Sequence, residues 1–253
     1  MSPLAIASIV FAFVLGSGVL GLYVRSFLPE HHLREDSMGI VTLGAGLIAT
    51  LAALVLGLLI ASAKSNFDKI SDEVTQTAAK VVMLDRSLAQ YGPETKEARD
   101  LLHSAVASAV ELMLSGKDST LAKLDAQERQ TKIEQFQEKV WALSPRTDAQ
   151  RALQARALDL SNELTQIRWL VIEQGEGSMP TPFMVVLVAW LAILFAGFGL
   201  VSVKNSTVVA TLVLCALSVA GSMFLIEDMN RPLQGLMKIS SAPMRNALSH
   251  LGQ

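Results

Sequence analysis

The chain has 253 residues, of which 51% are hydrophobic and only 17% are charged. A mean hydropathy of +0.41 is more than a wholly soluble domain of this size normally carries. A formal net charge of -2 provides no basic field to attract nucleic acid, and the single cysteine, Cys215, cannot form an intrachain disulfide. These numbers exclude a nucleic-acid-binding protein and a disulfide-stabilised domain, and they favour a membrane protein.

Four long runs contain no Asp, Glu, Lys, Arg or His: residues 1–24, 37–63, 177–203 and 205–226. A bilayer core about 30 Å thick needs roughly 20 helical residues, and a charge at the centre of such a helix costs about 2.5 to 3.5 kcal/mol. Each run is therefore predicted to be a transmembrane helix. The first run is long for a signal peptide and follows no basic segment, so it is interpreted as a retained anchor.

The runs predict an all-α integral membrane protein in which a helical cytoplasmic domain separates the second and third of four transmembrane helices. Transmembrane helices 1 and 2 occupy residues 1–63, the cytoplasmic domain 64–176, transmembrane helices 3 and 4 177–226, and a cytoplasmic tail 227–253. All Lys and Arg residues except Arg25, Arg34 and Lys204 then lie on the side of the domain and both termini. The positive-inside rule makes that side cytoplasmic, as in a multi-pass protein of a bacterial inner membrane.

Apolar residues of the central segment recur with helical spacing. A first seam steps by four and three residues until Tyr91-Gly92-Pro93, and it consists of Ile70, Val74, Thr77, Val81, Leu84 and Leu88. The seam is predicted to continue the second transmembrane helix, and it forms either an oligomer axis or a contact within its own subunit. Three more helices are expected, over about residues 102–113, 118–143 and 148–174.

Motifs for catalysis are missing from the sequence. It has no Gly-rich phosphate loop, no cysteine pair for a metal and no nucleophilic triad that spacing singles out. The protein is therefore predicted not to be an enzyme and to bind neither a cofactor nor a metal. The polar loop containing Glu30, His31, His32, Glu35 and Asp36 is interpreted as solvated rather than as a metal site.

The faces of the second transmembrane helix differ in composition, and different roles are predicted for them. Small residues favour close packing of another helix on one face, with Gly46, Thr50, Ala53 and Gly57 as the helix-packing candidates. The neighbouring faces are largely apolar, and around a symmetry axis they would form a constriction that gates by dewetting. The pore or gate candidates there are Thr42, Ala49, Ala52, Leu56 and Ile60.

A charged turn follows the last transmembrane helix. Its members, the cytoplasmic collar candidates, are Glu227, Asp228, Arg231, Pro232 and Gly235. Proline stops a helix and glycine favours a turn, so the tail is expected to fold back instead of extending the helix. The turn is either an ordinary helix stop with an interfacial ion pair or a collar that controls ion entry.

Four segments resemble a bacterial membrane family of unknown function that is called bestrophin-like: residues 25–29 (RSFLP), 46–64, 84–94 (LDRSLAQYGPE) and 230–235 (NRPLQG). The most specific is an acidic residue at the end of the last span followed by Arg-Pro-x-x-Gly, although Leu233 stands where the family is expected to have Phe. True bestrophins are pentameric anion channels with four membrane helices per subunit. The resemblance implies a homo-oligomer, by analogy a pentamer, that conducts anions such as chloride through an apolar constriction in the second span.

Two other classes share this layout. One is a stator-like pentameric subunit that works with a partner protein, because stator subunits also have four spans and a cytoplasmic helical domain. The other is a non-conducting membrane scaffold or sensor. Fold does not establish function, so the channel is the preferred of three hypotheses. The expected partners are the lipid bilayer, further copies of the chain and anions, with no nucleic acid.

Overall fold

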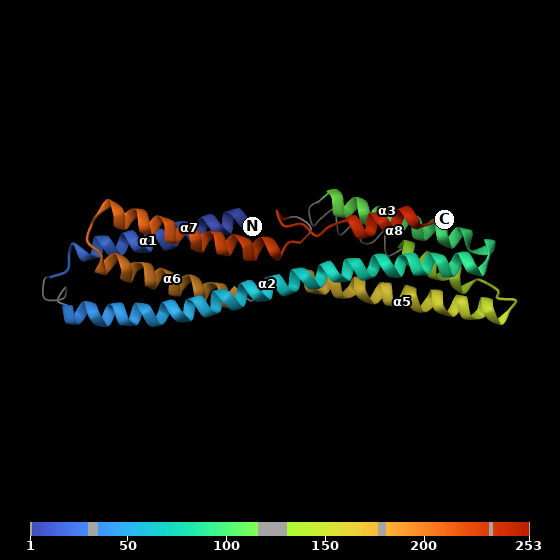
Figure 1. The fold of residues 1–253 in the computed structure, drawn as a ribbon, viewed down its shortest axis with the longest axis horizontal. Helices are drawn as coiled ribbons and strands as arrows, with labels where there is room; N and C mark the ends of the chain where they lie inside the picture. The colour runs from blue at the N-terminus through green and yellow to red at the C-terminus, as the bar shows by residue number, and fades with distance from the viewer. Residues whose placement is uncertain (1, 30–34, 116–130, 177–180, 233–234, 253) are drawn as a thin grey trace. The chain divides into compact units, whose positions relative to one another are not determined.

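The computed structural model describes residues 2–29, 35–115, 131–176, 181–232 and 235–252, and all regular structure in these ranges is helical (Figure 1). The labelled elements are α1 (Pro3–Arg25), α2 (Glu35–Tyr91), the 3-10 helix η2 (Pro93–Thr95), α3 (Lys96–Ser115), α5 (Asp148–Glu176), α6 (Thr181–Val201), α7 (Ser206–Met229) and α8 (Ala242–His250). They divide into unit 1, Met1–Asn66 with Gly177–Arg231, and unit 2, Phe67–Glu176 with Pro232–Gln253.

Four helices of the described ranges are long and apolar enough to cross a bilayer. They are Pro3–Arg25, Met38–Tyr91, Pro182–Val201 and Ser206–Met229. Each contains most of one of the four uncharged runs. A helix of this length without ionisable side chains would expose a large apolar surface to water, and a bilayer removes that surface from water. The helical fold class with four such helices is therefore confirmed. The sides of the membrane and the domain boundaries remain predictions.

Glycines set the distance between α1 and α6 in unit 1. A Cβ added to Gly21 of α1 would overlap the carbonyl of Ala196 in α6, and one added to Gly199 of α6 would overlap the carbonyl of Gly18. Lipid tails are as apolar as leucine, so membrane helices associate through close van der Waals packing of small residues. Gly21 and Gly199 therefore allow the two backbones to approach more closely than any larger side chain would permit.

The C-terminal ends of α1 and α6 are joined by a guanidinium group. Arg25 Nη1 donates hydrogen bonds to the carbonyl oxygens of Leu200 and Val201, both at 2.8 Å. These carbonyls belong to the last turn of α6, where backbone acceptors have no partner within the helix and a cation is favoured. Beyond this turn, Lys204 Nζ lies 5.3 Å from the centre of the Tyr23 ring, a cation–π contact.

A single helix, α2, runs from Glu35 to Tyr91, which confirms the expected continuation of the second span into the central segment. It ends where the sequence predicts. Gly92 has a φ of 139°, a conformation that L side chains rarely adopt, and Pro93 follows it. The Thr95 hydroxyl then bonds to the carbonyls of Leu88 and Gly92, at 2.7 and 2.8 Å, and closes the turn into α3.

The core of unit 2 contains residues from α2, α3, the helix at 131–141, α5 and α8. Its buried members are Ala78, Val81, Leu84, Leu88, Ala98, Leu102, Val106, Val110, Phe136, Val140, Ala157, Leu160, Met244, Ala247 and Leu251. The seam residues Val81, Leu84 and Leu88 thus pack within their own subunit. The sequence left two roles open for the seam, an oligomer axis or a contact within the chain. For these three residues the structure shows a contact within the chain.

Two glutamines of α5 donate hydrogen bonds to backbone carbonyls near the ends of neighbouring helices in unit 2. Gln150 Nε2 donates to the Tyr91 carbonyl at 3.1 Å, and Gln154 Nε2 donates to the Val140 and Leu143 carbonyls at 2.8 and 3.1 Å. Tyr91 and Val140 lie at the ends of their helices, where backbone carbonyls lose their partners within the helix, although the Val140 carbonyl also accepts the Leu143 N–H at 3.4 Å. Residues 131–141 are helical, in agreement with the third helix expected here, while its expected start at Asp118 lies outside the described residues.

The tail after α7 folds into a turn and a short helix. α7 ends at Met229, three residues before Pro232, and the Ile239 N–H donates to the Pro232 carbonyl at 3.0 Å. The predicted stop of the last apolar helix is therefore confirmed. The helix α8 was not expected, although Met244, Ala247 and Leu251 have the spacing of one helical face.

Candidate functional site

Four of the five pore or gate candidates lie on the face of α2 that the chain itself covers. Ala52 is 3% exposed, and Ala49, Leu56 and Ile60 are half-buried, whereas Thr42 is exposed. A covered face is not the pore-lining surface that the sequence predicts for these residues. A side chain already packed inside its own subunit is not available to line a central pore unless the subunit rearranges.

At Ala45, the same face of α2 contacts α6. The Cβ of Ala45 is 3.9 Å from the position that a Cβ on Gly197 would occupy, an ordinary van der Waals contact. Leu59 and Ala63, which follow Ala45 at helical spacing, are also buried. Small residues therefore mediate helix packing in unit 1, but on a face that neighbours the one with the predicted helix-packing candidates.

An apolar stripe is exposed on the other side of α2. This stripe, called the α2 stripe below, consists of Ile40, Leu43, Leu47, Thr50, Leu54 and Leu58. Leu43 is 80% exposed and Leu54 is 71% exposed, and the members follow one another at steps of three or four residues. Apolar side chains this exposed on a membrane helix contact lipid, another subunit or a pore.

The helix-packing candidates lie in or beside the α2 stripe. Thr50 belongs to the stripe, Ala53 is exposed, and a Cβ added to Gly46 or Gly57 would meet nothing within 4 Å. No helix of the described chain approaches these glycines. Thr50 donates its hydroxyl proton to the carbonyls of Gly46 and Leu47, at 2.9 and 2.8 Å, so it satisfies itself on its own helix and leaves the stripe without a strong donor.

The collar candidates lie at and after the end of α7, and one of their two carboxylates, Asp228, is buried. Asp228 is 2% exposed, and its backbone carbonyl accepts the Arg231 N–H at 3.0 Å. Glu227, Arg231, Pro232 and Gly235 are half-buried. A carboxylate at this depth cannot present a charged surface to passing ions, so the geometry favours the helix stop over the collar.

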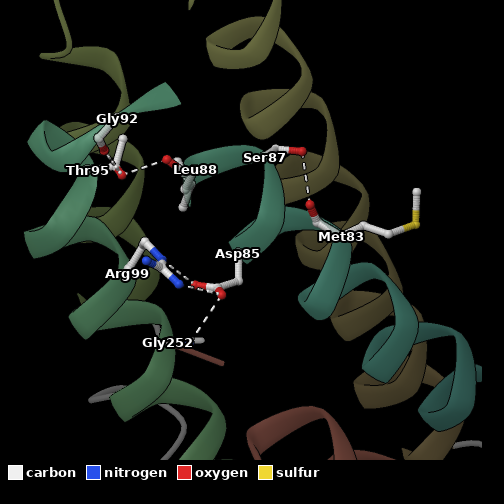
Figure 2. A network of polar contacts seen from close by, with 8 residues as sticks. All are labelled: Met83, Asp85, Ser87, Leu88, Gly92, Thr95, Arg99 and Gly252. Carbon is white, nitrogen blue, oxygen red and sulfur yellow. Dashed lines mark hydrogen bonds and ion pairs between the residues drawn. The ribbon is translucent and has the colours of Figure 1, made fainter. Parts of the chain in front are cut away.

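A buried ion pair in unit 2 was not anticipated from the sequence, and Figure 2 shows it with its neighbours. Asp85, 3% exposed on α2, accepts hydrogen bonds from Arg99 of α3: Nε lies 2.7 Å from Oδ1 and Nη2 lies 2.9 Å from Oδ2. The Gly252 N–H also donates to Oδ2, at 3.2 Å. The available signal was an acidic residue next to Leu84 on an apolar seam, within the segment that carries the family resemblance.

The contact with Asp85 favours the charged form of Arg99. The hydrogen bonds and the charge of Asp85 raise the pKa of Arg99 above its already high usual value, although partial burial opposes the shift. A two-pronged guanidinium–carboxylate contact is the strongest geometry available to these groups. Asp85 and Arg99 therefore form a fixed contact between α2 and α3 rather than a site for proton transfer.

A second ion pair of α3, between Glu97 and Lys139, is exposed to solvent. Lys139 Nζ lies 2.7 Å from Glu97 Oε2. The hydrogen bond and charge of Lys139 lower the pKa of Glu97, and Glu97 in turn raises the pKa of Lys139. Water screens this exposed pair, so its contribution to stability is small.

Clusters of three or more His, Cys, Asp or Glu that could hold a metal ion do not occur in the part of the chain that the structure describes. Of the polar loop considered in the sequence, Glu30, His31 and His32 lie outside the described residues. Cys215 is free and exposed on α7. Apolar side chains are also exposed on α1, α6 and α7, for example Leu20, Val185 and Leu214. The α2 stripe is the candidate site because it lies on the span for which the sequence predicts a constriction.

Comparison with known proteins identifies the fold. A family model for the bestrophin-like domain matches residues 6–244. Two crystal structures of a bacterial bestrophin homologue from Klebsiella pneumoniae, each carrying a point mutation, are similar to the chain with TM-scores of 0.59 and 0.60 and identities of 14% and 15%. The alignments cover 97% and 96% of this chain and 98% and 99% of those chains.

A further crystal structure, described as that of a membrane protein, is also similar to the chain. It has a TM-score of 0.59 and 15% identity over 96% of this chain and 99% of that chain. Comparison with curated protein sequences finds no match. At such identities the structures establish a shared fold, and function has to be argued from the residues.

Proposed function

The chain belongs to the bestrophin-like family, and from this premise we propose that it forms a homo-oligomeric channel that conducts anions across the bacterial inner membrane. The observation that carries the proposal is the α2 stripe, which leaves Leu54 and Leu58 exposed on a membrane helix. In a ring of subunits, six uncovered positions in line would form a narrow apolar wall. Such a wall stops ions by excluding water until it widens.

The constriction is assigned to Leu54 and Leu58 rather than to Leu56 and Ile60. Leu54 and Leu58 are one helical turn apart and exposed, whereas Leu56 and Ile60 are half-buried within the subunit. Only the exposed pair can reach an axis without unpacking the subunit. Residues 37–63 contain no ionisable side chain, so conduction would be limited by wetting and not by a charged binding site.

Small residues beside the α2 stripe support an oligomer, which we expect to be a pentamer. Gly46 and Gly57 have open space where a side chain would stand. A neighbouring α2 helix could therefore approach closely, and small residues are the usual basis for association of membrane helices. The helix-packing candidates then act between subunits instead of within one.

Flux measurements on variants in liposomes test the assignment. The double variant Leu54→Ala/Leu58→Ala should raise chloride flux several-fold, because removing the larger side chains widens the dry segment. The matched control is Leu56→Ala/Ile60→Ala, which changes the covered face of the same helix. It should lower the thermal stability of the oligomer without raising flux.

Other outcomes of the flux measurement would move the gate or contradict the channel proposal. A gain of flux in the control alone would place the gate at Leu56 and Ile60. If neither the parent nor either variant passes ions, the channel proposal is wrong, and a symmetric reconstruction of the oligomer then separates the alternatives. A helix of another protein on the axis would identify a stator-like subunit, while a closed or lipid-filled centre would identify a non-conducting scaffold or sensor.

A further inference from the structure

The C-terminal helix α8 owes its structure to docking. It has nine residues, and its N-cap residue Ser241 makes no side-chain capping bond. Helices this short are not stable alone in water, because too few hydrogen bonds offset the cost of starting the helix. Met244, Ala247 and Leu251 are buried in the core of unit 2 from one face of the segment. The segment is therefore helical because it packs on the rest of unit 2.

Asp85 holds the end of the C-terminal segment at Gly252, and it keeps its hydrogen bonds to Arg99 when Gly252 leaves. Asp85 accepts two hydrogen bonds from Arg99, in α3, and one from the Gly252 N–H (Figure 2). A buried carboxylate without a partner would be costly, but the pair with Arg99 persists when Gly252 leaves. Loss of the tail contact thus costs one hydrogen bond and does not isolate a buried charge.

These two observations point to a segment with two states. We propose that residues 242–252 form a releasable latch, which undocks from unit 2 while α2 and α3 stay folded, and that Asp85 is the residue that holds the docked state. Release exposes a groove beside α3 that accepts a short amphipathic helix with apolar residues at the spacing of Met244, Ala247 and Leu251. The occupant of this groove is the tail of the chain itself. The proposal does not depend on ion conduction.

Hydrogen exchange on the full-length protein in nanodiscs tests independent release. In the parent, amides of α8 should exchange at least tenfold faster than the central amides of α3, because the segment opens without the core. Asp85→Asn should accelerate exchange in α8 by a further factor of ten, since it weakens the acceptor for Gly252. It also weakens the contact with Arg99, so exchange in α3 should accelerate as well, but by a smaller factor than in α8. The matched control Glu97→Gln removes an exposed ion pair of α3 and should leave α8 unchanged.

Equal exchange rates of α8 and α3 in the parent would show that the tail opens only with the core, and this would overturn the latch. An equal acceleration of both helices in Asp85→Asn would overturn it too, because Asp85 would then support the unit as a whole.

A peptide experiment keeps the proposal testable if Asp85→Asn does not fold. The chain ending at Ser240 should still assemble with a protected α3, and a fluorescent peptide of residues 241–253 should bind it saturably. A peptide carrying Leu251→Asp should not bind, because a carboxylate would enter the apolar groove. A truncated protein with an unprotected α3, or the absence of saturable binding by the parent peptide, would contradict a releasable latch. Neither arm measures ion flux, so failure here is distinct from failure of the channel proposal.

Discussion

Leu54 and Leu56 are two residues apart on α2 and point to opposite sides of it: Leu54 is 71% exposed, while Leu56 is half-buried within its own subunit. Both are apolar and both belong to the same uncharged run. In the proposed oligomer, this difference in exposure determines which side of the helix is available to other subunits. It also allows the two faces to be tested with otherwise identical substitutions.

Intersubunit crosslinking should distinguish these faces. With Cys215 replaced by serine, Leu54→Cys should form disulfide-linked dimers of subunits under mild oxidation, because the α2 stripe surrounds the proposed axis. Leu56→Cys should remain monomeric on a denaturing gel, since its face is occupied within the subunit. The reverse pattern would show that the covered face of α2 turns outward in the assembled protein.

The distribution of basic residues predicts an orientation in the membrane, with the central domain cytoplasmic. Phe27, beyond the end of α1, and Trp141, in unit 2, are both strongly exposed. In the Cys215→Ser background, Phe27→Cys should react with a membrane-impermeant maleimide in intact cells, and Trp141→Cys should react only after lysis. Labelling of Trp141→Cys in intact cells would refute a cytoplasmic central domain.

The glycine contact between α1 and α6 should not tolerate a methyl group. Gly21→Ala would overlap the Ala196 carbonyl, and overpacking of this kind costs about 1 to 3 kcal/mol. The melting temperature of the detergent-solubilised protein should therefore fall by several degrees. Gly16→Ala is the matched control, because a Cβ at Gly16 of the same helix meets nothing within 4 Å. Equal melting temperatures for both variants would show that α1 moves away from α6 freely.

The two-pronged contact of Arg99 predicts a loss on conservative replacement. Arg99→Lys keeps the charge but cannot donate two parallel hydrogen bonds to Asp85, so it should destabilise unit 2 by about 1 to 2 kcal/mol. The measurement is the denaturant midpoint of the purified protein. A midpoint equal to that of the parent would mean that charge alone, without the paired geometry, stabilises this contact.

The pH dependence of the exposed pair has a predictable sign. Lys139 lowers the pKa of Glu97 from its usual value of 4.5, so the folded state favours the ionised carboxylate. The small stabilisation is complete above the unfolded-state pKa and is lost as the pH falls through the lowered folded-state value. The difference in melting temperature between the parent and Glu97→Gln should therefore be largest near neutral pH and vanish in strong acid. A difference that grows in acid would contradict this ion pair.

What the sequence determined by itself was the number, position and ends of the apolar helices. Residues 37–63 could only be a buried or membrane helix, because they contain no ionisable side chain. The end of α2 near Gly92-Pro93 and the end of α7 before Pro232 followed from the conformations that glycine and proline impose. These are local constraints, and neighbouring residues are enough to express them.

The tertiary structure alone decided which face of α2 is covered and which buried polar groups meet. Both faces of a membrane helix are apolar, so periodicity offers no contrast by which to tell the side facing α6 from the α2 stripe. Asp85 bonds to Arg99 14 residues away and to Gly252 167 residues away, separations over which sequence spacing carries no information about contact. The helix α8 is too short to be stable by itself, and it forms because Met244 and Leu251 find a core built by other helices.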